Sequence, residues 1–307
     1  MTEMNLRILD LIKENKSLKE ISSLLKISEK QLYVRIRQLI NYGYFLEPTY
    51  TCDSDIYYNI NTRNINKEKK NSIILKTPTD LKKLRCIVIS DLHIGNVNSD
   101  IDLLKKVYDY ASKNDIHIIF NCGDLIEGVH TCDKRNINNI HDQIEFIISK
   151  HPYDKNINNY VIFGNHDYHE FHYMGLDISK RIENLRHDIV SLGFGQGIVN
   201  IKKEKILLQH ELCAVNLPKI EDDIKLALVG HGHMMKTKVY DNLLLCVPSL
   251  SRVCPDKTKE NIPSFLDLEL HFTRDNFEFI RSKQMLVEPN IVPISESRCR
   301  MKVLEKY

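Results

Sequence analysis

Residues 163–170 read FGNHDYHE and directly follow an apolar run at residues 160–162. Such a run is typical of a buried strand, and the chain leaves it through a glycine to place Asn165, His166 and Asp167 side by side. Asparagine and aspartate are depleted in strands, but all three side chains carry atoms that bind metals or move protons. A polar group at the carboxyl end of a strand therefore indicates chemistry, if the rest of the chain supplies partners for it.

Other apolar runs end in similar polar groups. RCIVIS (85–90), IHIIF (116–120), KILLQ (205–209) and LALV (226–229) all read as short buried strands. Because the carboxyl ends of parallel strands gather at one edge of an open α/β sheet, we expect the polar groups that follow them to converge. These groups are Asp91 and His93, Asp124, His210, and His231 and His233.

The residue types in these groups favour a two-metal site. Asp, Asn and His ligands without cysteine suit Mn²⁺, Fe or Zn²⁺ better than a structural thiolate zinc site. A carboxylate shared by two metals holds them roughly 4 Å apart, where a bridging hydroxide can attack phosphorus in line. Asp124 is the residue expected to be shared.

The ordered series DLHIG (91–95), GD (123–124), GNHD (164–167), His210 and GHGH (230–233) resembles the calcineurin-like metallophosphoesterase superfamily over about residues 85–280. The resemblance implies an α/β fold, a two-sheet αββα sandwich over residues 84–285. It also implies two divalent metal ions, Mn²⁺ first, with Fe, Zn or Ni as alternatives.

Carried over to this chain, the resemblance implies a role for each motif residue. The first metal would be held by Asp91, His93 and His233, the second by Asn165, His210 and His231, with Asp124 shared between them. His166 would be catalytic rather than a ligand, stabilising the transition state or protonating the leaving oxygen. Asp167 is a candidate for the carboxylate that orients it.

The same motifs narrow the branch of the superfamily. Phosphoprotein phosphatases have an Arg after the acidic residue of the second motif and GNHE as the third, whereas Gly128 follows Glu127 here and the third motif is GNHD. DLHIG and GNHD are more similar to SbcD-like DNA repair exonucleases and to cyclic-nucleotide or other phosphodiesterases.

Residues 1–65 have the pattern of a winged helix-turn-helix domain. Apolar positions in 4–14 predict one helix, and capping-box pairs at Ser17 with Glu20 and at Ser28 with Gln31 predict two more. YFLEPTYTCDSDIYYNI (44–60) then alternates like a hairpin, and residues 66–83 are expected to be a linker with one strand at 72–76. The third helix would offer nucleic-acid contacts from Lys30, Gln31, Arg35, Arg37, Gln38 and Asn41. The alternative is a module for homodimerisation or partner docking, because residues 1–65 are close to charge-balanced.

The composition sets wider limits. A net charge of +2 over 307 residues gives no overall field toward nucleic acid or a membrane. The eight cysteines form no CxxC pair, and the first residues show no signal peptide or membrane span, so we expect a cytoplasmic protein with reduced thiols. Residues 286–307 are expected to be a C-terminal tail.

Together these features predict a metal-dependent phosphodiesterase. The N-terminal domain favours DNA, or else RNA, as the substrate. The alternatives are a small-molecule or cyclic-nucleotide phosphodiesterase or phosphomonoesterase, and a regulator that binds metals without turnover.

Overall fold

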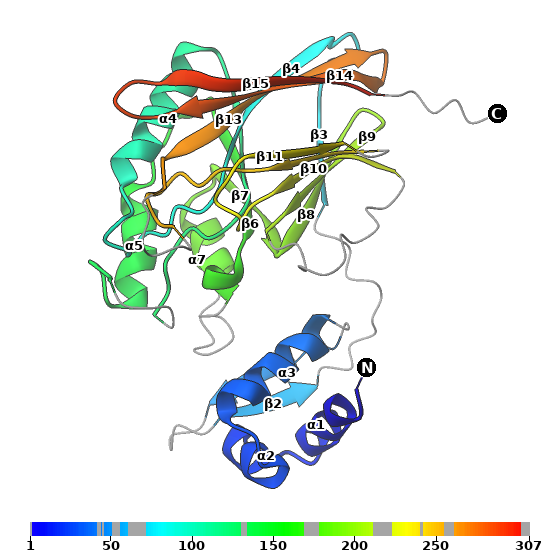
Figure 1. The fold of residues 1–307 in the computed structure, drawn as a ribbon, viewed down its shortest axis with the longest axis vertical. Coiled ribbons are helices and arrows are strands. Elements are labelled where there is room, and N and C mark those ends of the chain that lie inside the picture. The colour runs from blue at the N-terminus through cyan, green and yellow to red at the C-terminus, as the bar shows by residue number, and fades with distance from the viewer. Residues whose placement is uncertain are drawn as a thin grey trace, which may run out of the picture. The chain divides into compact units, whose positions relative to one another are not determined.

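Figure 1 shows the structure, a computed structural model. It describes residues 2–41, 44, 46–50, 56–60, 72–129, 134–168, 178–210, 223–239, 242–254 and 261–301. The described residues up to 60 form one compact unit, and those from 72 onward form a second.

The N-terminal unit consists of three helices followed by an antiparallel hairpin. The predicted capping box is present at Ser17, whose Oγ accepts from Glu20 N (3.3 Å) while Glu20 Oε2 accepts from Ser17 N (2.7 Å). Ser28 and Gln31 form the same reciprocal pair before the third helix. All five elements contribute apolar side chains to one core. The elements are α1 (Glu3–Lys13), α2 (Leu18–Leu25), α3 (Glu29–Asn41), β1 (Leu46–Tyr50) and β2 (Ile56–Ile60).

The second unit contains a seven-stranded sheet in the order β15-β14-β13-β4-β5-β6-β7. Its parallel half is β4 (Lys83–Ile89), β5 (Ile118–Asn121), β6 (Asn158–Phe163) and β7 (Ile189–Phe194). Its antiparallel half is β13 (Ser264–Thr273), β14 (Asn276–Leu286) and β15 (Val292–Arg300). The helices α4 (Ile101–Lys113), α5 (Ile140–Lys150) and α7 (Ile178–Leu185) connect strands of the parallel half.

A six-stranded sheet in the order β11-β12-β10-β9-β8-β3 forms the other layer. Its central strands β9 and β10 are parallel to each other, so their carboxyl ends also lie together. The strands are β3 (Ser72–Leu75), β8 (Gln196–Ile201), β9 (Glu204–Gln209), β10 (Ile224–Val229), β11 (Lys236–Val239) and β12 (Leu243–Cys246).

The main core lies between the two sheets, where apolar residues such as Phe120, Leu208 and Leu268 are fully buried. The other face of the seven-stranded sheet packs against α4, where Tyr110 accepts a hydrogen bond through its hydroxyl from the guanidinium of Arg85 in β4 (3.0 Å). Figure 1 shows α4 and α5 along this sheet. The predicted α/β fold with two central sheets is confirmed.

Two expected boundaries need correction. The strand expected at 72–76 is present as β3 (72–75), but it pairs with β8, so this part of the expected linker belongs to the second unit. The expected tail contains β15, which pairs with β14 along its whole length. β15 is an edge strand whose side chains are mostly exposed, and its sequence therefore lacks the apolar run by which buried strands are recognised.

Two further features bear on the expectations from composition. Cys86, Cys122 and Cys246 are free thiols; the first two are buried and Cys246 is half-buried. Within the described part of the chain, every helix is too short or too polar to cross a membrane.

Candidate metal centre

The polar groups that follow the central strands meet at one edge of the two sheets. Asp91 follows β4, Asp124 follows β5 and Asn165 follows β6, while His210 and His231 follow β9 and β10 of the other sheet. Backbone hydrogen bonds tie the first two turns together, from Asp91 N to the Gly123 carbonyl (2.9 Å) and from His93 N to the Asp124 carbonyl (3.0 Å). The predicted convergence is therefore present.

Asp91, His93 and His233 form the first group. Asp91 Oδ1 lies 3.2 Å from His233 Nε2 and 3.8 Å from His93 Nε2, and the two imidazole Nε2 atoms are 3.3 Å apart. Asp124 Oδ2 lies 3.9 Å from His93 Nε2, at the border of this group. All four side chains are buried.

Asp124, His210, His231 and Asn165 form the second group. His210 Nε2 lies 3.0 Å from Asp124 Oδ2 and 3.0 Å from Asn165 Oδ1. Ligand atoms of Asp124, His210 and His231 all lie within 4.8 Å of one another. His231 is exposed, so this group is more open to solvent than the first.

In both Asp91 and Asp124, one carboxylate oxygen accepts a backbone hydrogen bond and the other is left for a cation. Asp91 Oδ2 accepts the backbone N–H of His231 (3.1 Å), and Asp124 Oδ1 accepts that of His166 (2.9 Å). The other oxygen of each, Asp91 Oδ1 and Asp124 Oδ2, is buried without a hydrogen-bond partner among the described residues and faces imidazole nitrogens. Buried carboxylate oxygens need a donor or a cation, so the residues present fit two divalent metals.

Two candidate ligands are hydrogen-bonded through the imidazole Nδ1, and a third has its Nδ1 beside a carboxylate. His210 Nδ1 donates to the Cys122 carbonyl (2.6 Å), and His233 Nδ1 donates to the Val253 carbonyl (2.7 Å). His93 Nδ1 lies 3.0 Å from the carboxylate Oε2 of Glu127. A proton held on Nδ1 leaves Nε2 as the atom that can bind a metal, and in all three residues Nε2 faces the centre.

The backbone of the ligand turns is unusual. Asp91 (φ 57°), His93 (50°), Asp124 (55°), His231 (64°) and His233 (55°) all have left-handed backbone conformations. They make up half of the ten described non-glycine residues with positive φ. Such conformations are disfavoured for L residues and gather at functional sites.

The electrostatics of the centre follow from its pairing of acids with imidazoles. Burial alone would lower the pKa of His93 and His210, but the carboxylates of Asp91, Glu127 and Asp124 outweigh it and raise both pKa values to about 10. Burial alone would raise the carboxyl pKa values, yet the imidazoles lower those of Asp91 and Asp124. A metal that binds here therefore replaces protons.

His166 lies beside the first group, with its ring centroid 4.6 Å from that of His93 in an edge-on arrangement. Its Nδ1 donates to the backbone carbonyl of Glu127 (2.8 Å), and its Nε2 lies 3.9 Å from Asp124 Oδ2. The atom that faces the centre is thus Nε2, which can transfer a proton.

The hypothesis that Asp167 orients His166 is wrong. Asp167 is buried, and burial, with the negative charge of Asp124, raises its pKa to about 7. His166 and Asp167 share one helical turn, in which neighbouring side chains point about 100° apart. The Asp167 carboxylate instead accepts backbone N–H groups of Leu125 (3.0 Å), Ile126 (3.0 Å) and Gly164 (2.8 Å).

Glu127 is the residue that sequence reasoning missed. Its carboxylate contacts His93 Nδ1 and lies 3.9 Å from His166 Nδ1, while its carbonyl accepts from His166. It therefore positions one candidate ligand and the candidate acid at once. The available signal was an acidic residue three positions after Asp124 in a loop of otherwise apolar residues and glycines.

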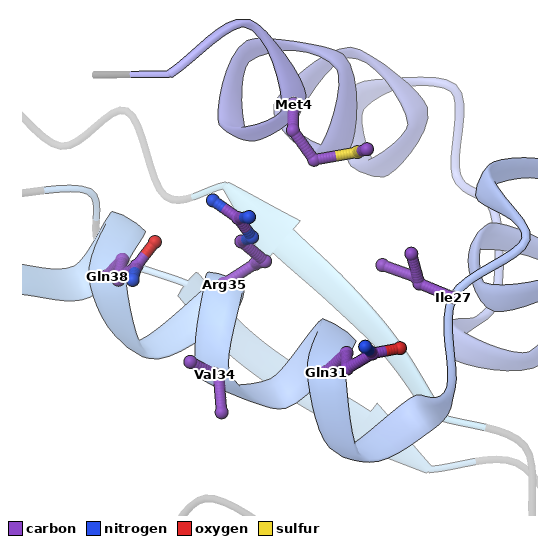
Figure 2. Close-up of a pocket in the computed structure, with 6 residues that line it drawn as sticks. All are labelled: Met4, Ile27, Gln31, Val34, Arg35 and Gln38. Atoms are coloured by element: carbon purple, nitrogen blue, oxygen red, sulfur yellow. The ribbon is translucent and has the colours of Figure 1, made fainter.

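Two of the predicted nucleic-acid contacts, Arg35 and Gln38, are hydrogen-bonded to other residues of the N-terminal unit. Arg35 is half-buried, points from α3 toward the helix that carries Met4 (Figure 2) and donates to Thr2 Oγ1 (3.4 Å) and Asn5 Oδ1 (3.5 Å). Gln38 Oε1 accepts from Asn5 Nδ2 (3.3 Å). A hollow of about 260 Å³ is lined by Met4, Ile27, Gln31, Val34, Arg35 and Gln38. The side chains of Lys30, Arg37 and Asn41 lie outside the described residues.

Similar solved structures include the phosphoesterase YfcE from E. coli (16% identity, TM-score 0.43, covering 71% of this chain and 100% of that one). Others are a Vps29 single mutant from Entamoeba histolytica (15%, 0.40, 71% and 100%) and GAP50, the anchor in the inner membrane complex of Plasmodium (12%, 0.43, 73% and 90%). At these identities and TM-scores the structural likenesses carry no information on the substrate. No curated protein matches the sequence significantly.

A sequence profile of the calcineurin-like phosphoesterase superfamily domain matches residues 84–269, more than half of the chain. This range contains every residue of the two groups. The chain therefore belongs to the calcineurin-like phosphoesterase superfamily and is a metal-dependent phosphoester hydrolase.

Proposed function

We propose that the chain is a two-metal phosphodiesterase that cuts nucleic acid, DNA in preference to RNA, with Mn²⁺ as its working metal. The observation that carries this proposal is the pair of buried carboxylate oxygens, Asp91 Oδ1 and Asp124 Oδ2, which face imidazole nitrogens without a hydrogen-bond donor among the described residues. Seven oxygen and nitrogen ligands without thiolate suit Mn²⁺ and related ions.

In this proposal Asp91, His93 and His233 hold one metal, and Asn165, His210 and His231 hold the other. Asp124 is shared, which agrees with Asp124 Oδ2 lying 3.0 Å from His210 and 3.9 Å from His93. Bound divalent metals would supply Lewis-acid stabilisation of the phosphoryl oxygens and generate the nucleophile from water.

His166 acts as the general acid. Its Nδ1–H is held by the Glu127 carbonyl, so the proton that it gives up must come from Nε2. The doubly protonated ring therefore starts the cycle, donates the Nε2 proton to the leaving oxygen and ends as the Nδ1–H tautomer. Glu127 keeps the ring in one orientation throughout.

The N-terminal unit supports nucleic acid as the substrate. Three helices followed by a hairpin are typical of a winged helix-turn-helix domain, and α3 exposes Gln31 and Gln38, whose amides can pair with adenine. A second binding domain on the same chain raises the effective concentration of a polymeric substrate. An SbcD-like nuclease branch agrees with the GNHD motif at 164–167.

One observation favours a second candidate, a small-molecule phosphodiesterase whose N-terminal unit serves dimerisation or docking. Arg35 and Gln38, two of the expected nucleic-acid contacts, bond to Thr2 and Asn5 of the same unit. The Arg35 donors and the Gln38 Oε1 acceptor used in this way are less available to DNA.

The test compares substrates in Mn²⁺ for the full chain. We expect DNA, linear or circular, to be cut faster than RNA, and RNA faster than bis-aryl phosphate. Mono-aryl phosphate should not be cut. Asp124→Ala and His210→Ala should abolish turnover, and His166→Ala should lose rate while still binding metal. Turnover of cyclic or mononucleotide substrates only, with no gel shift of DNA by Asp124→Ala, would replace this proposal with the second candidate.

A further inference from the structure

Two fully buried serines, Ser249 and Ser251, lie in the segment that leaves β12 and passes the metal centre. Buried hydroxyls are disfavoured unless they are hydrogen-bonded, so two of them in one short segment require an explanation. Neither residue belongs to the motifs that identify the superfamily.

The hydrogen bonds around Ser249 Oγ use every donor and acceptor of that hydroxyl. Ser251 N donates to Ser249 Oγ (3.0 Å), and Ser251 Oγ lies 2.9 Å away, where its proton can fill the second lone pair. The single proton of Ser249 is then free for a carbonyl: the Asp91 carbonyl lies 3.0 Å from Ser249 Oγ, and the Ser251 carbonyl is more distant at 3.3 Å. The pair therefore forms a closed network that ends on Asp91.

The same segment also contacts His233. Ser249 N donates to the His233 carbonyl (3.3 Å), and the Val253 carbonyl accepts from His233 Nδ1 (2.7 Å). Val253 N in turn donates to Ser251 Oγ (3.4 Å), so the serine network and the imidazole anchor belong to one turn.

Asp91 and His233 are both in the first group, and both have left-handed backbone conformations. A disfavoured backbone conformation persists only where its surroundings hold it. The second group has an anchor of its own, because His210 Nδ1 donates to the Cys122 carbonyl beyond β5, and its His231 contacts Asp91 through the side-chain Oδ2 rather than the carbonyl.

We propose that Ser249 is a positioning residue for the first metal alone, holding the backbones of Asp91 and His233 so that their side chains meet. The inference rests on the metal centre of the proposed function. Loss of the hydroxyl leaves the Asp91 carbonyl without this donor and lets the Asp91 turn relax, while the second group keeps its own anchors. Outer hydrogen-bonding partners of this kind change metal affinity by about 10–100-fold.

The experiment measures Mn²⁺ binding by calorimetry in full-length variants that each retain one site. In His210→Ala, which keeps the first site, adding Ser249→Ala should raise Kd by about 10–100-fold. In His233→Ala, which keeps the second site, the same change should leave Kd within about twofold. Ser249→Thr retains the hydroxyl and should restore most of the affinity.

Ser282→Ala is the matched control, since it removes a buried hydroxyl that bonds Ser297 Oγ (2.8 Å) within the β14–β15 pair. It should leave both affinities unchanged. If Ser249→Ala fails to fold, as judged by circular dichroism, Ser251→Ala tests the same network and should weaken the first site selectively. An equal loss at both sites, or none at the first, overturns the proposal. Absence of Mn²⁺ binding by His210→Ala itself would instead overturn the metal assignment, and this proposal with it.

Discussion

Replacing Gly164 by alanine places a methyl group inside the metal centre. An ideal Cβ at this position would lie 2.7 Å from Asp124 N and 2.7 Å from His210 Nε2, and closer still to Asp124 Oδ1. Ordinary contacts of a Cβ begin at 3.4 Å, so the contacts with Asp124 N and His210 Nε2 are about 0.7 Å too short and the contact with Asp124 Oδ1 is shorter still. Asp124 and His210 are each 1% exposed and anchored by hydrogen bonds, so neither can retreat without leaving its place in the centre.

The size of the effect follows from these overlaps. Overpacking of a tightly packed site costs about 1–3 kcal/mol, which lowers Tm by roughly 2–10 °C for a unit of this size. Displacement of catalytic groups by about 1 Å costs on the order of 100-fold in rate. Gly164→Ala should therefore melt earlier in EDTA, bind Mn²⁺ more weakly and lose about 100-fold in kcat/KM on bis-aryl phosphate.

Gly232→Ala is the matched control in another ligand motif. The nearest heavy atom to an added Cβ there is the Gly230 carbonyl oxygen at 3.9 Å, and Gly232 has no positive φ. This variant should keep Tm, Mn²⁺ affinity and turnover. Equal behaviour of the two variants, in either direction, would refute the argument from crowding at Gly164.

Two further predictions concern protons. Carboxylates raise the pKa values of His93 and His210 to about 10 without metal, so Mn²⁺ binding at pH 8 should release about two protons and become tighter as the pH rises toward 10. Calorimetry in two buffers of different ionisation enthalpy measures the number of protons released. Binding without proton release would contradict the prediction. Burial, together with the charge of Arg186, lowers the pKa of His151 to about 4 in the folded chain, from a value near 6.5 in the unfolded chain. Between pH 6.5 and 4 the unfolded chain therefore binds more protons than the folded chain, and the free energy of unfolding should fall by about 3 kcal/mol over this range. Denaturant unfolding should show that His151→Gln flattens this loss, whereas the exposed His187→Gln should not.

The sequence predicted the elements whose signals are local or strongly patterned. Capping boxes at Ser17 and Ser28 are read from residues three apart, and both are present. The convergence of the polar groups at Asp91, Asp124 and Asn165 followed from one rule, that parallel strands end at a common edge.

The residues that support the site could not be predicted in this way. Glu127 and Ser249 contact His93 and Asp91 from segments far apart in the chain, so their partners cannot be read from their own neighbours in sequence. The prediction that Asp167 orients His166 was wrong for the opposite reason. The two residues are adjacent in sequence, which suggested a contact, but the helical turn points their side chains in different directions. The edge strand β15 was missed because exposure on both faces removes the apolar pattern.

The left-handed ligand residues show why part of the site leaves no trace in the sequence. Glycine is the residue that most often adopts a positive φ, so Gly95 and Gly123 mark turns that can be recognised in the sequence. Asp91, His93 and His233 cannot be glycine, because the turn must also deliver a ligand, and each such conformation costs about 1 kcal/mol or more. Five of them together approach the net stability of a typical domain. The backbone bonds to Gly123 and Asp124 hold these turns, and the proposed contact of the Ser249 hydroxyl and the cations that the centre would bind add to this hold. Removing the metals should consequently loosen these turns before it unfolds either sheet.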